Sequence, residues 1–217
     1  MLGIVARTAL ALSVVLALAN CGDSSETSST AVAGDSPGES ISIAGSAALR
    51  WGDGDYGVVL GHGAAFDAAS WEKQAVAIAD QGATVIAVEN IDPDSIRDAV
   101  EQLQGEGIAD VALVGASAGA DAILDLASQE PGLADQLILL SPNAVVDGLG
   151  DEPKLFIAST DEPVANVSTE LAESSPGDDN AVELVPGSAH AQNIFATDLA
   201  SSVLDAMLER LKRFASQ

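Results

Sequence analysis

Residues 111–127, VALVGASAGADAILDLA, decide the fold of this chain. The apolar run at 111–114 is typical of a buried strand, and the apolar spacing at 120–127 is typical of a helix. Between them lies Ser117, with Gly115 and Gly119 two residues away on either side. Glycines suit a turn that crowds the neighbouring backbone, where a Cβ would clash. The stretch therefore predicts a strand, a tight turn that exposes the Ser117 hydroxyl, and a helix whose N-terminus favours negative charge at that turn.

The rest of the chain alternates short β-like runs with helix-length segments, beginning at residue 41. Strands are expected at 41–44, 47–51, 56–60, 83–88, 110–114, 136–140, 154–158 and 181–185, the first two as an edge hairpin, and helices at 68–80, 94–105, 118–129 and 197–214. Asp94, after Pro93, is expected to cap the second helix. Continuous apolar strands separated by helices predict an α/β protein with a mostly parallel sheet covered on both faces. Functional residues in such a sheet gather at the carboxyl ends of the strands.

The composition limits both the architecture and the partners. A chain of 217 residues is long enough for one domain with its own core. Hydrophobic residues make up 47% but aromatic residues only 3%, so the core must be built from small side chains. The net charge of −25 argues against a nucleic-acid partner, because such a surface repels phosphates. We interpret the acidic surface as a means of solubility.

The first twenty residues are typical of a signal peptide. One charge, Arg7, precedes an apolar run at 8–19 that is too short to span a membrane. The segment ends at Leu18-Ala19-Asn20-Cys21, which resembles a bacterial lipobox, although Asn20 stands where glycine or alanine is usual. Cys21 is the only cysteine of the chain. The resemblance implies lipid attachment at Cys21, and the alternatives are an ordinary secretory signal or an uncleaved anchor.

The sequence predicts a chain in three parts. We expect residues 1–20 to form the signal peptide, and residues 21–40, rich in serine, glycine and acidic side chains, to form a disordered tether with a reach of about 25 Å. Residues 41–217 form the folded domain. We therefore expect a protein outside the cytoplasm, held to the cell membrane by a lipid, or secreted in the alternative.

Polar residues that suit serine chemistry follow several of the predicted strands. A nucleophilic serine needs a base and usually a carboxylate to orient that base. The only two histidines are His62, after the strand at 56–60, and His190, after the strand at 181–185. Asp161 and Glu162 follow the strand at 154–158. Together with Ser117, these residues point to nucleophilic catalysis.

From residue 56 to residue 214 this arrangement resembles the α/β-hydrolase family, in which the order is serine, acid, histidine and the serine lies on a nucleophile elbow. The resemblance implies Ser117 as nucleophile, His190 as base and Asp161 as orienting acid. Asp161 is favoured over the alternative, Glu162, because the shorter side chain is usual in the family. His62 and Gly63 would mark the oxyanion loop, and the backbone N–H groups of Ala64 and Ala118 would form the oxyanion hole.

The short connection after the strand at 136–140 bears on the substrate. Only eleven residues separate Pro142 from Lys154, which leaves no room for a helical cap over the site. The resemblance then implies a small uncapped esterase, similar to dienelactone hydrolases, acting on small or solvent-accessible carboxylic esters. No cofactor and no metal site are expected. The alternatives are an acyltransferase with the same triad, or a membrane-tethered binding protein that keeps the fold without turnover.

Overall fold

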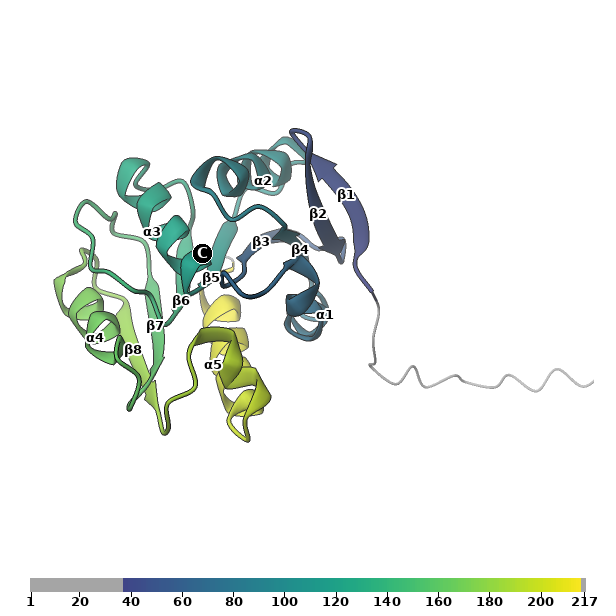
Figure 1. Ribbon diagram of the computed structural model, residues 1–217. Helices are drawn as coiled ribbons and strands as arrows, with labels where there is room; N and C mark the ends of the chain where they lie inside the picture. Colours follow the sequence, from purple (N-terminus) through teal and green to yellow (C-terminus); the bar gives the residue numbers. More distant parts are fainter. Residues whose placement is uncertain (1–36, 216–217) are drawn as a thin grey trace, which may run out of the picture. The chain divides into compact units, whose positions relative to one another are not determined.

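Eight strands form one sheet in the order β1-β2-β4-β3-β5-β6-β7-β8 (Figure 1). The computed structural model describes residues 37–215. The strands are β1 (Glu39–Ile43), β2 (Ser46–Trp51), β3 (Tyr56–Gly61), β4 (Ala83–Val88), β5 (Val111–Ala116), β6 (Gln136–Leu140), β7 (Lys154–Ser159) and β8 (Asn180–Val185). The first two pairings, β1 with β2 and β2 with β4, are antiparallel, and all the others are parallel. The predicted edge hairpin and mostly parallel sheet are confirmed.

Helices cover both faces of this sheet (Figure 1). They are η1 (Ala68–Trp71), α1 (Glu72–Ala79), α2 (Pro93–Gly105), α3 (Ala118–Gln129), α4 (Ala165–Ser174), η2 (Ala191–Ala196) and α5 (Ala200–Phe214), of which η1 and η2 are 3₁₀ helices. On one face η1, α1, η2 and α5 pack on the sheet, and on the other α2, α3 and α4. Every residue of the central strands β3 to β7 is buried, which explains their unbroken apolar runs.

Alternate residues along a strand serve the two faces. Val58 and Leu60 of β3 join the core that Trp71 and Met207 complete, while Val59 joins the core on the other face. Successive side chains of a strand point to opposite sides, so each central strand contributes to both cores. The second core is built mainly from Ile, Leu, Val and Ala, as the composition predicts.

Some predicted boundaries were wrong. Asp92, and not Asp94, caps α2: its Oδ1 accepts the N–H of Ser95 at 3.0 Å, and Pro93 is the first residue of the helix. Proline fits there because the first helical N–H has no partner within the helix, so the cap lies before the proline. The expected helix at 68–80 is η1 followed by α1. Helix α4 lies between Asp161 and His190, where the sequence has room for one helix, and η2 was not among the expected helices.

The N-terminal predictions fall mostly outside the described part of the chain. The signal peptide at 1–20, Cys21 and most of the tether at 21–40 lie outside residues 37–215. Strand β1 begins at Glu39, two residues before the expected start of the domain. None of the helices between residues 37 and 215 is both long and apolar enough to cross a membrane.

Candidate active site

Ser117 lies between the last residue of β5 and the first residue of α3, as the sequence predicts. Its backbone has φ 50° and ψ −115°, a conformation that costs a non-glycine residue about 1–3 kcal/mol. The turn is tight on both sides: a Cβ on Gly115 would lie 2.8 Å from Ala120 N, and one on Gly119 would lie 2.3 Å from Gly61 O. Gly115 therefore permits the tight turn from β5 into α3, and Gly119 permits the close approach of α3 to β3. Together they place Ser117 at the carboxyl ends of the strands.

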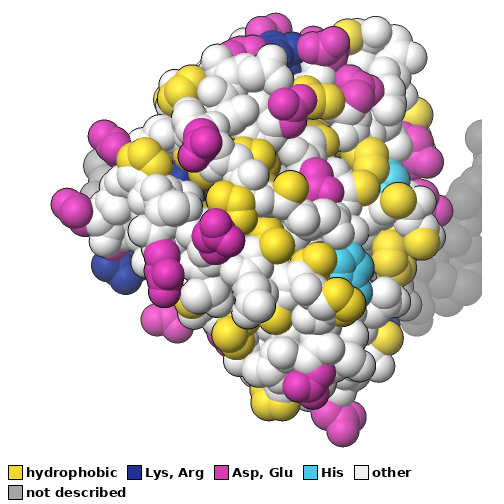
Figure 2. Space-filling model, turned by 60° about the vertical axis from the view of Figure 1, so that its left-hand side comes forward, with side chains coloured by type: hydrophobic (Ala, Val, Ile, Leu, Met, Phe, Trp, Pro, Cys, Tyr) yellow, Lys and Arg dark blue, Asp and Glu magenta, His cyan; other side chains and the backbone are white. Residues whose placement is uncertain are grey.

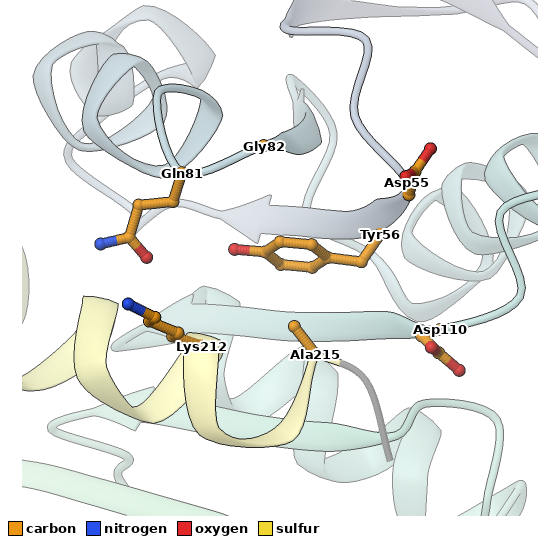
Figure 3. A pocket seen from close by; sticks show the side chains of 7 residues that line it. All are labelled: Asp55, Tyr56, Gln81, Gly82, Asp110, Lys212 and Ala215. Carbon is orange, nitrogen blue, oxygen red and sulfur yellow. The ribbon is translucent and has the colours of Figure 1, made fainter.

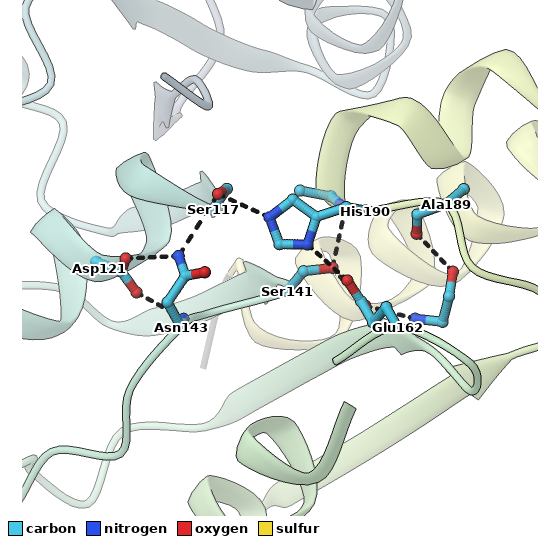
Figure 4. Close-up of polar contacts among 9 residues, drawn as sticks. Ser117, Asp121, Ser141, Asn143, Glu162, Ala189 and His190 are labelled. Carbon is cyan, nitrogen blue, oxygen red and sulfur yellow. Dashed lines mark hydrogen bonds and ion pairs between the residues drawn. The ribbon is translucent and has the colours of Figure 1, made fainter. Parts of the chain in front are cut away.

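Three side chains form a continuous hydrogen-bonded chain at this edge (Figure 4). His190 Nε2 lies 2.8 Å from Ser117 Oγ, so the hydroxyl can donate to the ring. His190 Nδ1 lies 2.6 Å from Glu162 Oε2, so the other ring nitrogen can donate to the carboxylate. The side chain of Glu162 is buried, whereas that of His190 is 37% exposed. A carboxylate, an imidazole and a hydroxyl in this order are the groups that make serine nucleophilic.

The carboxylate at His190 is that of Glu162, which corrects the expectation of Asp161. Asp161 is exposed, and its backbone N–H donates to Gly187 O at 2.8 Å. The turn after β7 buries Glu162 instead. Its longer side chain folds back so that Oε1 accepts the N–H of Ser159 at 2.7 Å while Oε2 reaches His190. The two acids are adjacent in the sequence, and the geometry of the turn selects between them.

Ser141, at the end of β6, fixes the carboxylate from the other side. Its hydroxyl donates to Glu162 Oε1 at 2.7 Å and accepts the N–H of Ala191 at 2.9 Å. Ser141 is fully buried and has a positive φ of 48°. The hydroxyl thereby links β6, the turn that carries Glu162 and the loop that carries His190. Ser141 was not identified from the sequence, although its place at the end of a predicted strand was a signal.

Asn143 was also not identified from the sequence. Its Nδ2 lies 3.5 Å from Ser117 Oγ and donates to Asp121 Oδ2 at 2.7 Å, and its backbone N–H donates to Asp121 Oδ1 at 2.8 Å (Figure 4). Asp121 lies in the first turn of α3. Asn143 and Asp121 join the loop after β6 to helix α3, next to Ser117.

The loop after β3 lies directly beside Ser117. A Cβ on Gly63 would be 3.6 Å from Ser117 Cβ. The N–H of Gly63 donates to Gln192 Oε1 at 2.8 Å, so it is already engaged within the protein. Ala64, the next residue, is exposed. On the other side of Ser117, Ala118 is the first residue of α3, a position whose N–H has no partner inside a helix.

His62 has a different place from His190. Its ring is buried, with Nδ1 2.9 Å from Gly63 O and Nε2 3.0 Å from Glu89 O. Both nitrogens face backbone carbonyl oxygens, one in its own loop and one after β4. The ring thus braces the loop, and the only histidine that contacts Ser117 is His190.

The surface around the site is acidic and uncapped. Figure 2 shows both histidines on one face, among hydrophobic side chains and with more acidic than basic groups around them. Residues 141–153, between β6 and β7, contain no helix, so the predicted absence of a cap at this position is confirmed. No group of three His, Cys, Asp or Glu side chains within residues 37–215 could hold a metal ion.

A cavity of about 570 Å³ lies at the other end of the strands, where the parallel strands begin (Figure 3). Its lining includes Tyr56 and Gly82, at the beginnings of β3 and β4, Asp110 just before β5, and Lys212 of α5. Burial raises the pKa of the Tyr56 hydroxyl. Since the strands are parallel here and Ser117 follows the end of β5, this cavity does not border Ser117.

Comparison with solved structures gives the same architecture at low sequence identity. The chain is similar to a monoglyceride lipase from Saccharomyces cerevisiae, with a TM-score of 0.70 and 12% identity over 86% of this chain and 98% of the other. It is similar to a predicted CIB-like hydrolase from Thermoplasma acidophilum (TM-score 0.65, 21% identity, 81% and 97% covered). A third similar structure is a monoacylglycerol lipase from Paleococcus ferrophilus (TM-score 0.64, 14% identity, 76% and 97% covered).

Sequence comparison adds nothing to this likeness. No protein-family model matches the chain, and no curated protein matches it. The strand order, the strand–Ser117–helix turn and the likeness to these structures together identify the α/β-hydrolase fold, without a cap domain in the described part of the chain.

Proposed function

We propose that the protein is a serine hydrolase that cleaves carboxylic esters through an acyl-enzyme on Ser117. The observation that carries this proposal is the unbroken hydrogen-bonded chain from Ser117 Oγ through His190 to Glu162. A hydroxyl with only a structural role has no need of a histidine oriented by a buried carboxylate. The fold shared with lipases supports the hydrolase class.

In the first half of the proposed reaction, Ser117 Oγ attacks the ester carbonyl carbon while its proton passes to His190 Nε2. The carbonyl oxygen becomes an oxyanion, which the N–H groups of Ala118 and Ala64 would stabilise. When the tetrahedral intermediate collapses, the bond to the alcohol oxygen breaks. His190 gives its proton to that oxygen, and the acyl group stays on Ser117.

Water completes the cycle by the same steps in reverse. His190 accepts a proton as the water oxygen attacks the acyl carbon, and it returns that proton to Ser117 Oγ as the acid leaves. Glu162 holds the ring in the tautomer with the proton on Nδ1 and stabilises the imidazolium that forms transiently. It does not take the proton itself.

The substrates we propose are small or solvent-accessible esters, including lactones of the kind that dienelactone hydrolases open. Support comes from the loop at 141–153, which has no helix to cover Ser117, and from the 37% exposure of the His190 side chain. An open site of this kind does not enclose a long acyl chain. We therefore expect acetate and butyrate esters to be cleaved faster than long-chain esters.

Acyl transfer is a second candidate, supported by the same open geometry. An alcohol could reach the acyl carbon from solvent as easily as water does. Adding glycerol to an ester hydrolysis assay and quantifying the acylated glycerol distinguishes the two reactions. A fraction of acyl groups transferred to glycerol that far exceeds the mole fraction of glycerol in the mixture would favour the transferase.

The direct test of the proposal uses a fluorophosphonate, which reacts with activated serines, and p-nitrophenyl acetate. The wild-type protein should be labelled at Ser117 and should hydrolyse the ester. Ser117→Ala should abolish labelling and lower turnover by about 10³-fold or more. The matched control is Ser128→Ala, on the surface of α3, which should leave both unchanged. An unlabelled wild-type protein, or full activity in Ser117→Ala, contradicts the proposal.

We also propose that Cys21 carries a lipid that holds the protein at the outer side of a cytoplasmic membrane. The support is the sequence alone: the leader at 1–20 and the cysteine that follows it. Mass spectrometry of the N-terminal peptide from membranes should show a lipidated Cys21 as the first residue. An unmodified Cys21 would leave the secreted alternative.

A further inference from the structure

Gln192 occupies a buried position between the base loop and the oxyanion loop. It lies two residues after His190, at the start of η2, and is only 6% exposed. Its Oε1 accepts the N–H of Gly63 at 2.8 Å, and its Nε2 donates to Ser70 Oγ in η1 at 2.8 Å. The amide thus uses both its acceptor and its donor, and it joins segments more than a hundred residues apart in the sequence.

The peptide group that follows Gly63 is fixed from a second direction. The carbonyl of Gly63 accepts the N–H of Phe66 at 2.9 Å and lies 2.9 Å from His62 Nδ1. In a trans peptide the N–H points away from the preceding carbonyl. The conformation of Gly63 therefore sets the direction of the Ala64 N–H. Gln192 helps to fix that conformation because its Oε1 accepts the N–H of Gly63.

We propose that Gln192 is a positioning residue. It keeps the Ala64 N–H aimed at the developing oxyanion and fixes the loop after β3 relative to the loop that carries His190. The inference rests on the serine-hydrolase function proposed above. Glutamine suits this place because it offers an acceptor to Gly63 and a donor to Ser70 while carrying no charge. A carboxylate there would place a negative charge beside the oxyanion that the loop must stabilise.

The test compares Gln192→Met with Gln136→Met. Gln136 is an equally buried glutamine at the start of β6, at the opposite edge of the sheet. In Gln192→Met we expect kcat/KM for p-nitrophenyl acetate to fall about 10- to 100-fold, since displacing one oxyanion donor has effects of this order. KM should change little. Gln136→Met should leave kcat/KM unchanged.

Inhibition by an alkyl trifluoromethyl ketone separates positioning from a purely structural role. This ketone forms a tetrahedral adduct whose oxygen occupies the oxyanion hole, so its affinity should fall by the same factor as kcat/KM. A Gln192→Met protein with wild-type kcat/KM contradicts the proposal. So does a protein that loses kcat/KM while its affinity for the ketone is unchanged.

Gln192→Glu provides the second variant, in case Gln192→Met fails to fold. A carboxylate oxygen can still accept the Gly63 N–H, but the carboxylate cannot donate to Ser70, so the loop is held less firmly. We expect parallel losses of about 3- to 10-fold in kcat/KM and ketone affinity. Loss in only one of the two, or in neither, overturns the inference. Wild-type protein without esterase activity would instead refute the proposed function, and with it the premise of this inference.

Discussion

At the scale of single residues, the site turns on which of two adjacent acids faces the histidine. Asp161 is exposed, while Glu162 places one oxygen on His190 and the other on Ser141 and Ser159. The carboxylate is thereby fixed before any substrate arrives. Because a histidine without its acid partner adopts the wrong tautomer, the identity of this residue has a large kinetic consequence.

We therefore expect Glu162→Gln to lower kcat/KM for p-nitrophenyl acetate by about 10³- to 10⁴-fold. The amide NH2 would donate to His190 Nδ1 and so favour the tautomer that leaves Nε2 unable to accept the Ser117 proton. The matched change Asp161→Asn should stay within about threefold of the wild type, as is usual for an exposed residue away from the reacting groups. Steady-state kinetics of the two purified variants check the ranking. The reverse order would restore Asp161 as the orienting acid.

What the sequence could reveal at this scale follows from distance along the chain. Ser117 was predictable because its turn is encoded by its immediate neighbours, Gly115 and Gly119. His190 was predictable because only two histidines exist. Ser141 and Gln192 were not, because their partners lie in other loops and only the folded sheet brings them together. Asp161 and Glu162 have the same sequence context, so the choice between them depended on a turn.

At the scale of elements, the elbow depends on how closely α3 approaches β3. Gly119 faces the backbone of Gly61 and His62 at the end of β3, and a Cβ there would overlap backbone atoms. No side-chain rearrangement can relieve this overlap. The strand and the helix would have to separate, and Ser117 lies at their junction.

Gly119→Ala should therefore lower the free energy of unfolding by about 1–3 kcal/mol and reduce kcat/KM together with it. The control is Gly105→Ala at the end of α2, where an added Cβ meets no atom within 4 Å. That change should raise the free energy of unfolding by about 0.4–1 kcal/mol and leave the kinetics unchanged. Urea denaturation and steady-state assays measure both. Equal effects of the two substitutions would contradict the tight packing at Gly119.

The elements themselves were largely predictable, and their ends were not. The five central strands, β3 to β7, were expected because buried parallel strands are continuous apolar runs. The cap of α2 was misplaced by two residues. The sequence at 92–94 has an aspartate on each side of a proline, and aspartate is a preferred N-cap residue at either position.

At the scale of the whole molecule, the dominant property is uncompensated negative charge. The chain has 33 acidic and 8 basic residues. Several of the basic residues are already engaged: Arg50 pairs with Glu106 at 2.7 Å, Arg97 with Glu130 at 2.6 Å, and the buried Lys154 ammonium donates to three backbone carbonyls. Little positive charge remains to offset the repulsion among surface carboxylates, which opposes the compact state.

We expect sodium chloride to stabilise the fold. Raising its concentration from about 0.05 M to about 1 M shortens the Debye length from above 10 Å to about 3 Å and weakens this repulsion. Each kcal/mol regained should raise the melting temperature by about 2–4 °C in a domain of this size. At about pH 4.5, where many carboxylates carry protons, the salt effect should shrink. A melting temperature that falls with salt at neutral pH would contradict this reasoning.

The positive φ of Ser117 has a consequence for how such a chain can change over evolutionary time. Glycine would occupy that backbone conformation with less strain, so the substitution that relaxes the turn also deletes the reactive hydroxyl. Stability and turnover therefore select for opposite residues at position 117. A descendant that had no use for the proposed reaction would gain stability by replacing the serine.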